Sequence, residues 1–334
     1  MLKTISLSLL FSALVVNFAH ASGSDPITTV GSSTVYPFAT VAAERFGKLT
    51  KFQTPVIEST GTGGGMKLFC NGVGYQHPDI TNASRPIKKS EKEKCKANGV
   101  TPVEMKVGYD GIVLANSKKG AKLSVTRDQL YRATAKEVWD GSKFILNPYK
   151  KWSDIDSSLP DLAIEVMGPP PTSGTRDAYV ELVQHKACKK LGIKKKGDDV
   201  YKARCSAVRE DGGYIEGVEK DNLIIQKLVG EPRRYGIFGF SFLDNNLDQL
   251  WGTAIDGVEP TFEGIASGDY PVSRGLFFYV KKEHIGMVPG LGEYVRFFAS
   301  KKMIGQTGAT VDKGLIPLPE DEYKVLIERI NKEL

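Results

Sequence analysis

The sequence predicts an α/β fold, because one local pattern occurs three times along the chain: a short β-rich run, a loop of Ser, Thr and Gly, and an amphipathic helix. Strands that alternate with helices are typical of mainly parallel sheets flanked by helices. The chain has 334 residues, and at roughly 100–200 residues per domain this length predicts two domains with separate cores. Its single long apolar stretch lies at the N-terminus, which excludes a membrane channel.

The first unit starts with a predicted strand over residues 27–30, followed by the loop Gly31-Ser32-Ser33-Thr34. A helix is expected from Tyr36-Pro37, because proline is well tolerated in the first turn of a helix. The apolar residues of this helix recur at helical spacing and predict its buried face. They are Phe38, Val41, Ala42, Phe46 and Leu49.

The second and third units repeat this order with different loops. A strand predicted over 55–58 precedes the Gly-rich loop 59–65 and a short helix. A strand predicted over 163–167 precedes the loop 169–175, and the helix after it begins at Arg176. The predicted apolar face of that last helix consists of Ala178, Leu182 and Val183.

Each of these loops has the chemistry of an oxyanion site. The first N–H groups of a helix have no partner within the helix, and the helix dipole places partial positive charge there. Ser and Thr hydroxyls donate beside them, and Gly lets the backbone approach a ligand closely. One such loop is usually only a helix cap. Three in one chain indicate a tetrahedral oxyanion, bound beyond the carboxyl ends of the strands.

The N-terminal residues have the features of a secretory signal peptide. Lys3 supplies a positive charge, residues 5–16 form an apolar run, and Ala19-His20-Ala21 fits the small-x-small cleavage pattern. The run is too short to span a bilayer. We therefore expect residues 1–21 to be removed, leaving a soluble periplasmic protein that begins near Ser22. A buried N-terminal helix is the alternative.

The four cysteines agree with an oxidising compartment. Four cysteines allow three connectivities, and the simplest joins the sequence neighbours Cys70 with Cys95 and Cys188 with Cys205. Each bond would then stabilise the fold by roughly 3 kcal/mol through the entropy of the unfolded chain. Free buried thiols are the alternative. No C-x-x-C spacing supports a zinc or thioredoxin-like site.

The known enzyme motifs fail in detail. The Gly-rich loop is similar to a P-loop, but Met66 and Leu68 stand where that motif needs Gly and Ser or Thr. The chain has no G-x-S-x-G nucleophile elbow. Once His20 is removed, the other histidines lack the spacing of a metal site or a triad; they are His77, His185 and His284. We therefore predict no enzyme activity, no metal and no cofactor.

Lysines cluster at 88–96, 118–122, 186–196 and 281–282, and the net charge is +6. Acidic and apolar residues interrupt these clusters, and stacking aromatics are absent from them. This pattern favours solvated surfaces over nucleic-acid binding, so we expect no nucleic-acid partner. The positive balance would steer anions to the protein at low salt.

Five segments together carry a resemblance to a known family. In chain order they are Gly31-Ser32-Ser33-Thr34-Val35-Tyr36-Pro37, Ser59-Thr60-Gly61-Thr62-Gly63-Gly64-Gly65, Asn82-Ala83-Ser84-Arg85-Pro86, Thr172-Ser173-Gly174-Thr175-Arg176 and Tyr235-Gly236-Ile237-Phe238-Gly239-Phe240. In this order and spacing they resemble the periplasmic phosphate-binding proteins of ABC importers, which belong to the two-domain (type II) solute-binding superfamily. The resemblance covers nearly all of the mature chain.

This resemblance implies which residues contact inorganic phosphate. From the first loop they are Ser33, Thr34 and the Val35 amide; from the second, Thr62; from the third segment, Ser84 and Arg85; and from the last loop, Ser173, the Gly174 amide, Thr175 and Arg176. It also implies a membrane permease as partner, and we expect a monomer without a cofactor.

Arg85 departs from the family pattern. Well-studied members have at this position an Asp that accepts a proton from the bound phosphate, and the Asp repels sulfate. An Arg instead favours any highly charged oxyanion, so we expect weaker discrimination against sulfate unless Asp110 or Asp211 replaces the missing carboxylate. A salt bridge beside the site is the alternative role for Arg85.

In this superfamily the chain crosses between two lobes twice, and the ligand lies in the cleft. The resemblance places one lobe at 22–115 and 276–334 and the other at 116–275, with crossings near Ala115-Asn116 and Arg274 to Phe277. It therefore implies a receptor that closes on phosphate and delivers it to an ABC importer. An exported binding or adhesion protein for another oxyanion, without a transport role, is the alternative.

Overall fold

The structure is a computed structural model that describes residues 26–171, 173–191, 199–217 and 221–334. The predicted signal peptide and cleavage site lie outside the described residues. No helix in these ranges has the length and apolar character needed to cross a bilayer.

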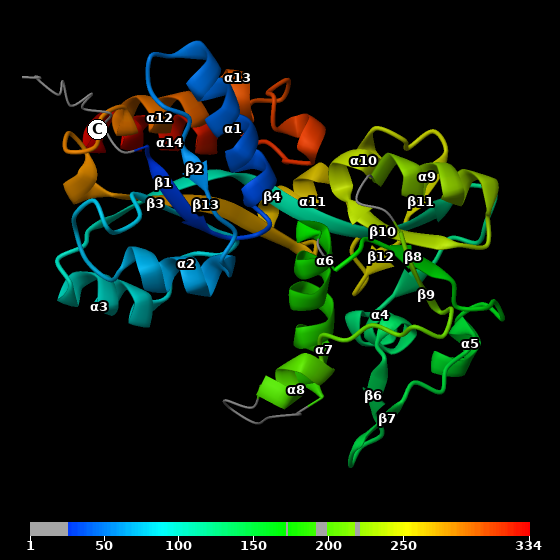
Figure 1. Cartoon of the computed structure of the whole chain (residues 1–334). Coiled ribbons are helices and arrows are strands. Elements are labelled where there is room, and N and C mark those ends of the chain that lie inside the picture. Colours follow the sequence, from blue (N-terminus) through cyan, green and yellow to red (C-terminus); the bar gives the residue numbers. More distant parts are fainter. Residues whose placement is uncertain (1–25, 172, 192–198, 218–220) are drawn as a thin grey trace, which may run out of the picture.

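Two long antiparallel strands join the two lobes of the molecule (Figure 1). They are β4 (Pro102–Ser117) and β13 (Ser273–Lys281). Strand β4 pairs with β13 up to Gly111, and from Ile112 it pairs with β10 (Tyr235–Gly239) in the other lobe. The two-lobe α/β fold is therefore confirmed, while the lobe boundaries 115/116 and 275/276 stay a prediction.

The sheet is mixed because its outer strands come from strand–helix–strand units, whereas the joining strands run antiparallel to their neighbours. In the first lobe β1 is parallel to β2 and β3, and in the second β8 is parallel to β9 and β10. The remaining strands are β1 (Thr28–Gly31), β2 (Val56–Ile57), β3 (Ile80–Ala83), β5 (Ser124–Val125), β6 (Glu137–Trp139), β7 (Phe144–Leu146), β8 (Val166–Gly168), β9 (Tyr214–Glu216), β11 (Leu250–Gly252) and β12 (Ala254–Ile255).

Helices cover both faces of the first-lobe sheet and surround the second-lobe sheet (Figure 1). Those of the first lobe are α1 (Tyr36–Leu49), α2 (Gly61–Phe69), α3 (Lys89–Ala97), α12 (Leu291–Phe298), α13 (Lys301–Ile304) and α14 (Glu320–Glu333). Those of the second are α4 (Arg127–Thr134), α5 (Trp152–Ile155), α6 (Gly174–Tyr179), α7 (His185–Lys190), α8 (Asp199–Arg204), α9 (Asp221–Gly230), α10 (Phe240–Asp244) and α11 (Phe262–Ser267). Three single-turn helices are η1 (Val180–Gln184), η2 (Lys282–His284) and η3 (Val311–Lys313).

Helix α1 shows how well the local pattern predicts packing. Pro37 lies in its first turn as expected, and Phe38, Ala42 and Phe46 are buried. Val41 is only partly buried, and Leu49 is 73% exposed, so its predicted place in the core is wrong. Leu49 is the last residue of the helix.

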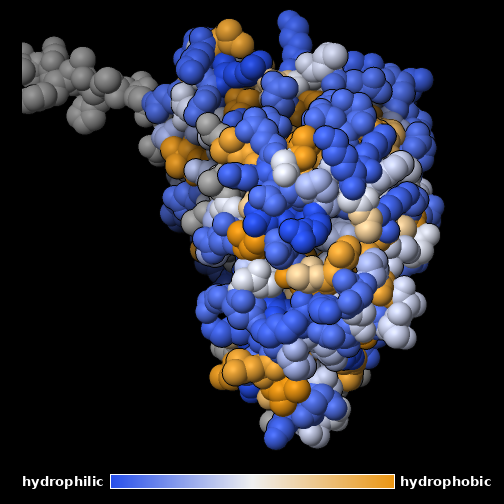
Figure 2. Space-filling view, turned by 90° about the vertical axis from the view of Figure 1, so that its right-hand side faces the viewer, coloured by the Kyte–Doolittle hydropathy of each residue, from blue (hydrophilic) through white to orange (hydrophobic). Residues whose placement is uncertain are grey.

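Both predicted disulfides are present, which confirms the local pairing of the cysteines. Cys70–Cys95 ties the end of α2 to α3, and Cys188–Cys205 ties α7 to the residue after α8. The first bond lies in a small apolar cluster between α2, α3 and the sheet. Figure 2 shows a mainly hydrophilic face of the second lobe, with a hydrophobic group at the lower end where Figure 1 places β6 and β7.

Candidate functional site

The first loop lies at the carboxyl end of β1 and leads directly into α1. Gly31 has a φ of +125°, and a Cβ there would collide with the backbone oxygen of Asn82, so this turn requires glycine. The Ser32 N–H donates to the same oxygen over 2.9 Å. These contacts fix Ser33, Thr34 and the Val35 amide beside the end of β3.

The Gly-rich segment forms the first turns of α2 rather than a loop, since the helix begins at Gly61. Gly65 packs on Gly31 so closely that a Cβ would lie 2.5 Å from the Gly31 Cα. The Thr62 hydroxyl lies 3.1 Å from the Ser84 hydroxyl and accepts the Ser84 N–H over the same distance. The second and third predicted segments therefore meet.

The Ser-Gly-Thr segment reaches the first loop from the other lobe. Ser173 caps α6, its hydroxyl accepting the Thr175 N–H over 3.2 Å. A Cβ on Gly174 would lie 3.0 Å from the Ser33 carbonyl oxygen and 3.1 Å from the Thr34 Cα. The two lobes touch here, as expected for a closed form, and pairwise contacts link all four predicted segments.

The two predicted ligand arginines have protein partners. Arg85 donates from both terminal nitrogens to Glu91, over 2.9 and 2.7 Å, and this pairing raises the pKa of Arg85. Arg176 is buried and donates to the Pro169 carbonyl and the Tyr214 hydroxyl, over 3.0 and 2.7 Å. Their contact with a ligand stays a prediction, and the alternative role of Arg85 in a salt bridge is the one present here.

A third arginine, Arg274, lies at the site without having been predicted as a ligand residue. Its side chain is 8% exposed, and it donates to the Thr34 hydroxyl over 2.7 Å. It also contacts Asp110 at 3.4 Å and Glu181 at 2.6 Å. The sequence placed Arg274 at a lobe crossing, but its contact with Thr34 depends on how β13 lies beside the first loop, which no motif shows.

The two carboxylates proposed to replace the family Asp have different surroundings in the structure. Asp211 is bound by Arg209 over 2.6 and 2.7 Å and by Lys150 over 2.7 Å, and the Arg209 hydrogen bonds lower its pKa most. Asp110 is buried, which raises its pKa against the opposing effect of Arg274. Only Asp110 is linked to the first loop, through Arg274 and Thr34.

Asn82 adds an unused polar group at the end of β3. The residue is 1% exposed, and neither amide atom has a partner in the described structure. Buried amides are nearly always satisfied. Asn82 pairs with Gly31 and lies two residues before Ser84, so its unpaired amide is buried next to the first loop.

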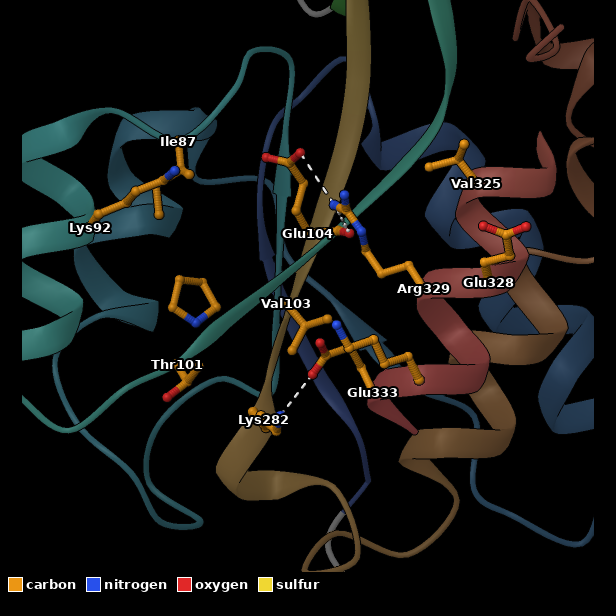
Figure 3. A pocket seen from close by; sticks show the side chains of 12 residues that line it. Ile87, Lys92, Thr101, Val103, Glu104, Lys282, Val325, Glu328, Arg329 and Glu333 are labelled. Carbon is orange, nitrogen blue, oxygen red and sulfur yellow. Dashed lines mark hydrogen bonds and ion pairs between the residues drawn. The ribbon is translucent and has the colours of Figure 1, made fainter. Parts of the chain in front are cut away.

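Hydroxyls, backbone amides and a guanidinium meet here, and these donors suit an oxyanion. The carboxylates of Asp110, Asp177 and Glu181 lie against the Ser33 hydroxyl and the guanidinium. Within the described ranges no cluster of His, Cys, Asp and Glu could hold a metal. A pocket of about 720 Å³ lies elsewhere, between α3, the start of β4 and α14 (Figure 3). None of the predicted site residues lines it, and it is crossed by the Lys282–Glu333 and Arg329–Glu104 ion pairs.

Comparison with known proteins agrees with this geometry. A family model described as a PBP superfamily domain matches residues 17–302. The chain belongs to this superfamily. The chain is 30% identical to Protein SphX of Synechococcus elongatus, over 91% of this chain and 80% of the relative. It is 28% identical to the phosphate-binding protein PstS of Staphylococcus saprophyticus, over 92% and 85% of the two chains.

A crystal structure of a possible phosphate-binding protein from Planctomyces limnophilus has the same fold. It superposes with a TM-score of 0.75 at 28% identity, covering 94% of this chain and all of the other. The predicted family resemblance is thereby confirmed. These relatives are named as binding proteins or by a protein name alone, and none of the three names describes an enzyme.

Proposed function

We propose that this chain is an exported receptor that captures inorganic phosphate between its lobes and delivers it to the permease of an ABC importer. The observation that supports the proposal is that the N-termini of α2 and α6 both contact the loop 31–34, which leads into α1: the Thr60 N–H donates to the Gly31 carbonyl over 2.9 Å, and Gly174 packs on Ser33 and Thr34. Such N-termini present free N–H groups and partial positive charge to an anion.

The proposed ligand shell follows the predicted residues, with Arg274 added. Its members are Ser33, Thr34, Val35, Thr62, Ser84, Arg85, Ser173, Gly174, Thr175, Arg176 and Arg274. Hydroxyls suit phosphate because they can donate to an oxygen or accept the phosphate proton. Arg274 supplies a charged donor next to Thr34. Capture without turnover fits this donor set.

The names of similar proteins and the predicted export of this chain support the same role. PstS of Staphylococcus saprophyticus is named a phosphate-binding protein. The predicted signal peptide and the two disulfides suit a periplasmic protein. Binding that closes two lobes gives the permease a loaded form to recognise. We propose that the receptor acts as a monomer.

The test is titration calorimetry on protein that has been unfolded, stripped of ligand and refolded. Phosphate, arsenate and sulfate are compared at pH 6 and pH 8. We expect tight binding of phosphate and of arsenate, which has the same shape and carries protons in the same pH range. Sulfate binding as tight as that of phosphate would contradict a phosphate receptor and indicate a general oxyanion receptor. Absence of all binding would refute the oxyanion site.

A further inference from the structure

Arg274 makes contacts with three separate parts of the molecule. Its Nε lies 3.4 Å from Asp110 on β4, its Nη2 donates to Thr34 in the first-lobe loop, and its Nη1 donates to Glu181 in the second lobe. Asp110 is its direct neighbour in the pairing of β4 with β13. The guanidinium is therefore anchored in the joining strands and bridges the two lobes.

A second contact between the lobes lies one helical turn away. The Ser33 hydroxyl donates to the Asp177 carboxylate over 2.5 Å. Asp177 and Glu181 are four positions apart, the spacing that places two side chains on the same face of a helix. The carboxylates of Asp177 and Glu181 in the second lobe thus hold the first-lobe loop at two points. Asp177 contacts Ser33 directly, and Glu181 is connected to Thr34 through Arg274.

The helix that carries these carboxylates is firmly held. Glu181 lies in η1, a single π-helical turn between α6 and α7, and such turns are frequent at functional sites. The Cys188–Cys205 disulfide ties the following helix to the rest of the lobe. Glu181 itself is 49% exposed and makes no contact with the predicted ligand hydroxyls other than through Arg274.

We propose that Glu181 and Asp177 form a latch that keeps the lobes closed, with Glu181 holding Arg274 and Asp177 holding Ser33. Both are positioning residues rather than ligand contacts. The part of this proposal that concerns phosphate release rests on the proposed function. Charge-assisted hydrogen bonds are about twice as strong as neutral ones, and interactions that exist only in the closed form slow ligand dissociation more than association.

The test compares Glu181→Gln, Asp177→Asn and the double variant with wild type. Glu165→Gln is the matched control, because Glu165 forms a 2.9 Å ion pair with Arg234 inside the second lobe. Dissociation of radiolabelled phosphate is measured together with the distance between spin labels on Leu49→Cys and Leu146→Cys. These label sites are exposed, one on each lobe.

We expect Glu181→Gln to raise the dissociation rate about tenfold with little change in the association rate. The label distances should also shift toward an open form, both with and without phosphate, while Glu165→Gln behaves as wild type. Unchanged label distances in the double variant would overturn the latch, whether or not phosphate binds. Because label distances need no ligand, failure of the latch and failure of phosphate binding are distinguishable.

Discussion

At the scale of single residues, Asp110 is the group that can replace the carboxylate missing at Arg85. The Asp110 carboxylate contacts the guanidinium of Arg274, and Arg274 donates a hydrogen bond to the Thr34 hydroxyl. A carboxylate can accept the proton that phosphate still carries at pH 8, whereas sulfate has no proton to donate and is only repelled. We predict that Asp110→Asn lowers the preference for phosphate over sulfate about tenfold, measured by calorimetry at pH 8.

Asp211→Asn is the matched control for that experiment. Its carboxylate is held by Arg209 and Lys150 and is not linked to the first loop. The phosphate-to-sulfate ratio of this variant should stay that of wild type. An equal loss in both variants would show that general charge, rather than Asp110, sets the preference, and thermal melts would verify that each variant is folded.

Asp211 should instead matter for stability, with a defined pH dependence. The Arg209 hydrogen bonds hold its pKa below the usual value, so the folded state favours the carboxylate. This stabilisation is present above the unfolded pKa of about 3.9 and is lost as the pH falls through the folded pKa. The side chain is 38% exposed, and solvent screening limits the expected loss in Asp211→Asn to about 1 kcal/mol at pH 7.

Denaturant unfolding of wild type and Asp211→Asn between pH 7 and pH 3 checks this sign. The difference in unfolding free energy should shrink as the pH falls below about 4. A difference that stays constant or grows over that range would contradict the assigned role of the Arg209–Asp211 pair.

At the scale of elements, the strand–loop–helix units could be predicted because their signals are local. The strands and helices at β1–α1 and β8–α6 begin within about three residues of the expected positions, whereas α2 begins at Gly61, inside the segment 59–65 that the sequence predicts as a loop. The disulfides also follow from local pairing. A hydrophobic period, a Gly-rich turn and an early proline are all properties of neighbouring residues.

Contacts that depend on tertiary register could not be predicted in this way. Arg274 meets Asp110 only because β13 and β4 pair in one particular register, and it meets Glu181 only because the lobes are closed. The bidentate contact of Arg85 with Glu91 depends on where α3 begins after Ser84. The π-turn at η1 has no sequence signal of comparable strength.

At the scale of the whole molecule, the proposed function depends on two lobes that close over the ligand. Strands β4 and β13 connect the two lobes (Figure 1), so we expect closure to be a motion about these strands. Ligand binding shifts such an equilibrium by the difference in affinity between the open and closed forms. Residues from both lobes must therefore contribute to affinity.

Calorimetry of phosphate binding to Gly174→Val tests this central claim most directly. A side chain at Gly174 would press on Ser33 and Thr34 across the cleft, whereas Gly230→Val, where a Cβ meets no atom within 4 Å, is the control. We predict that Gly174→Val weakens phosphate binding about ten- to a hundredfold while both variants melt at similar temperatures, because overpacking of this kind costs about 1–3 kcal/mol and only in the closed form. Wild-type affinity in a folded Gly174→Val protein would contradict capture of phosphate between the lobes.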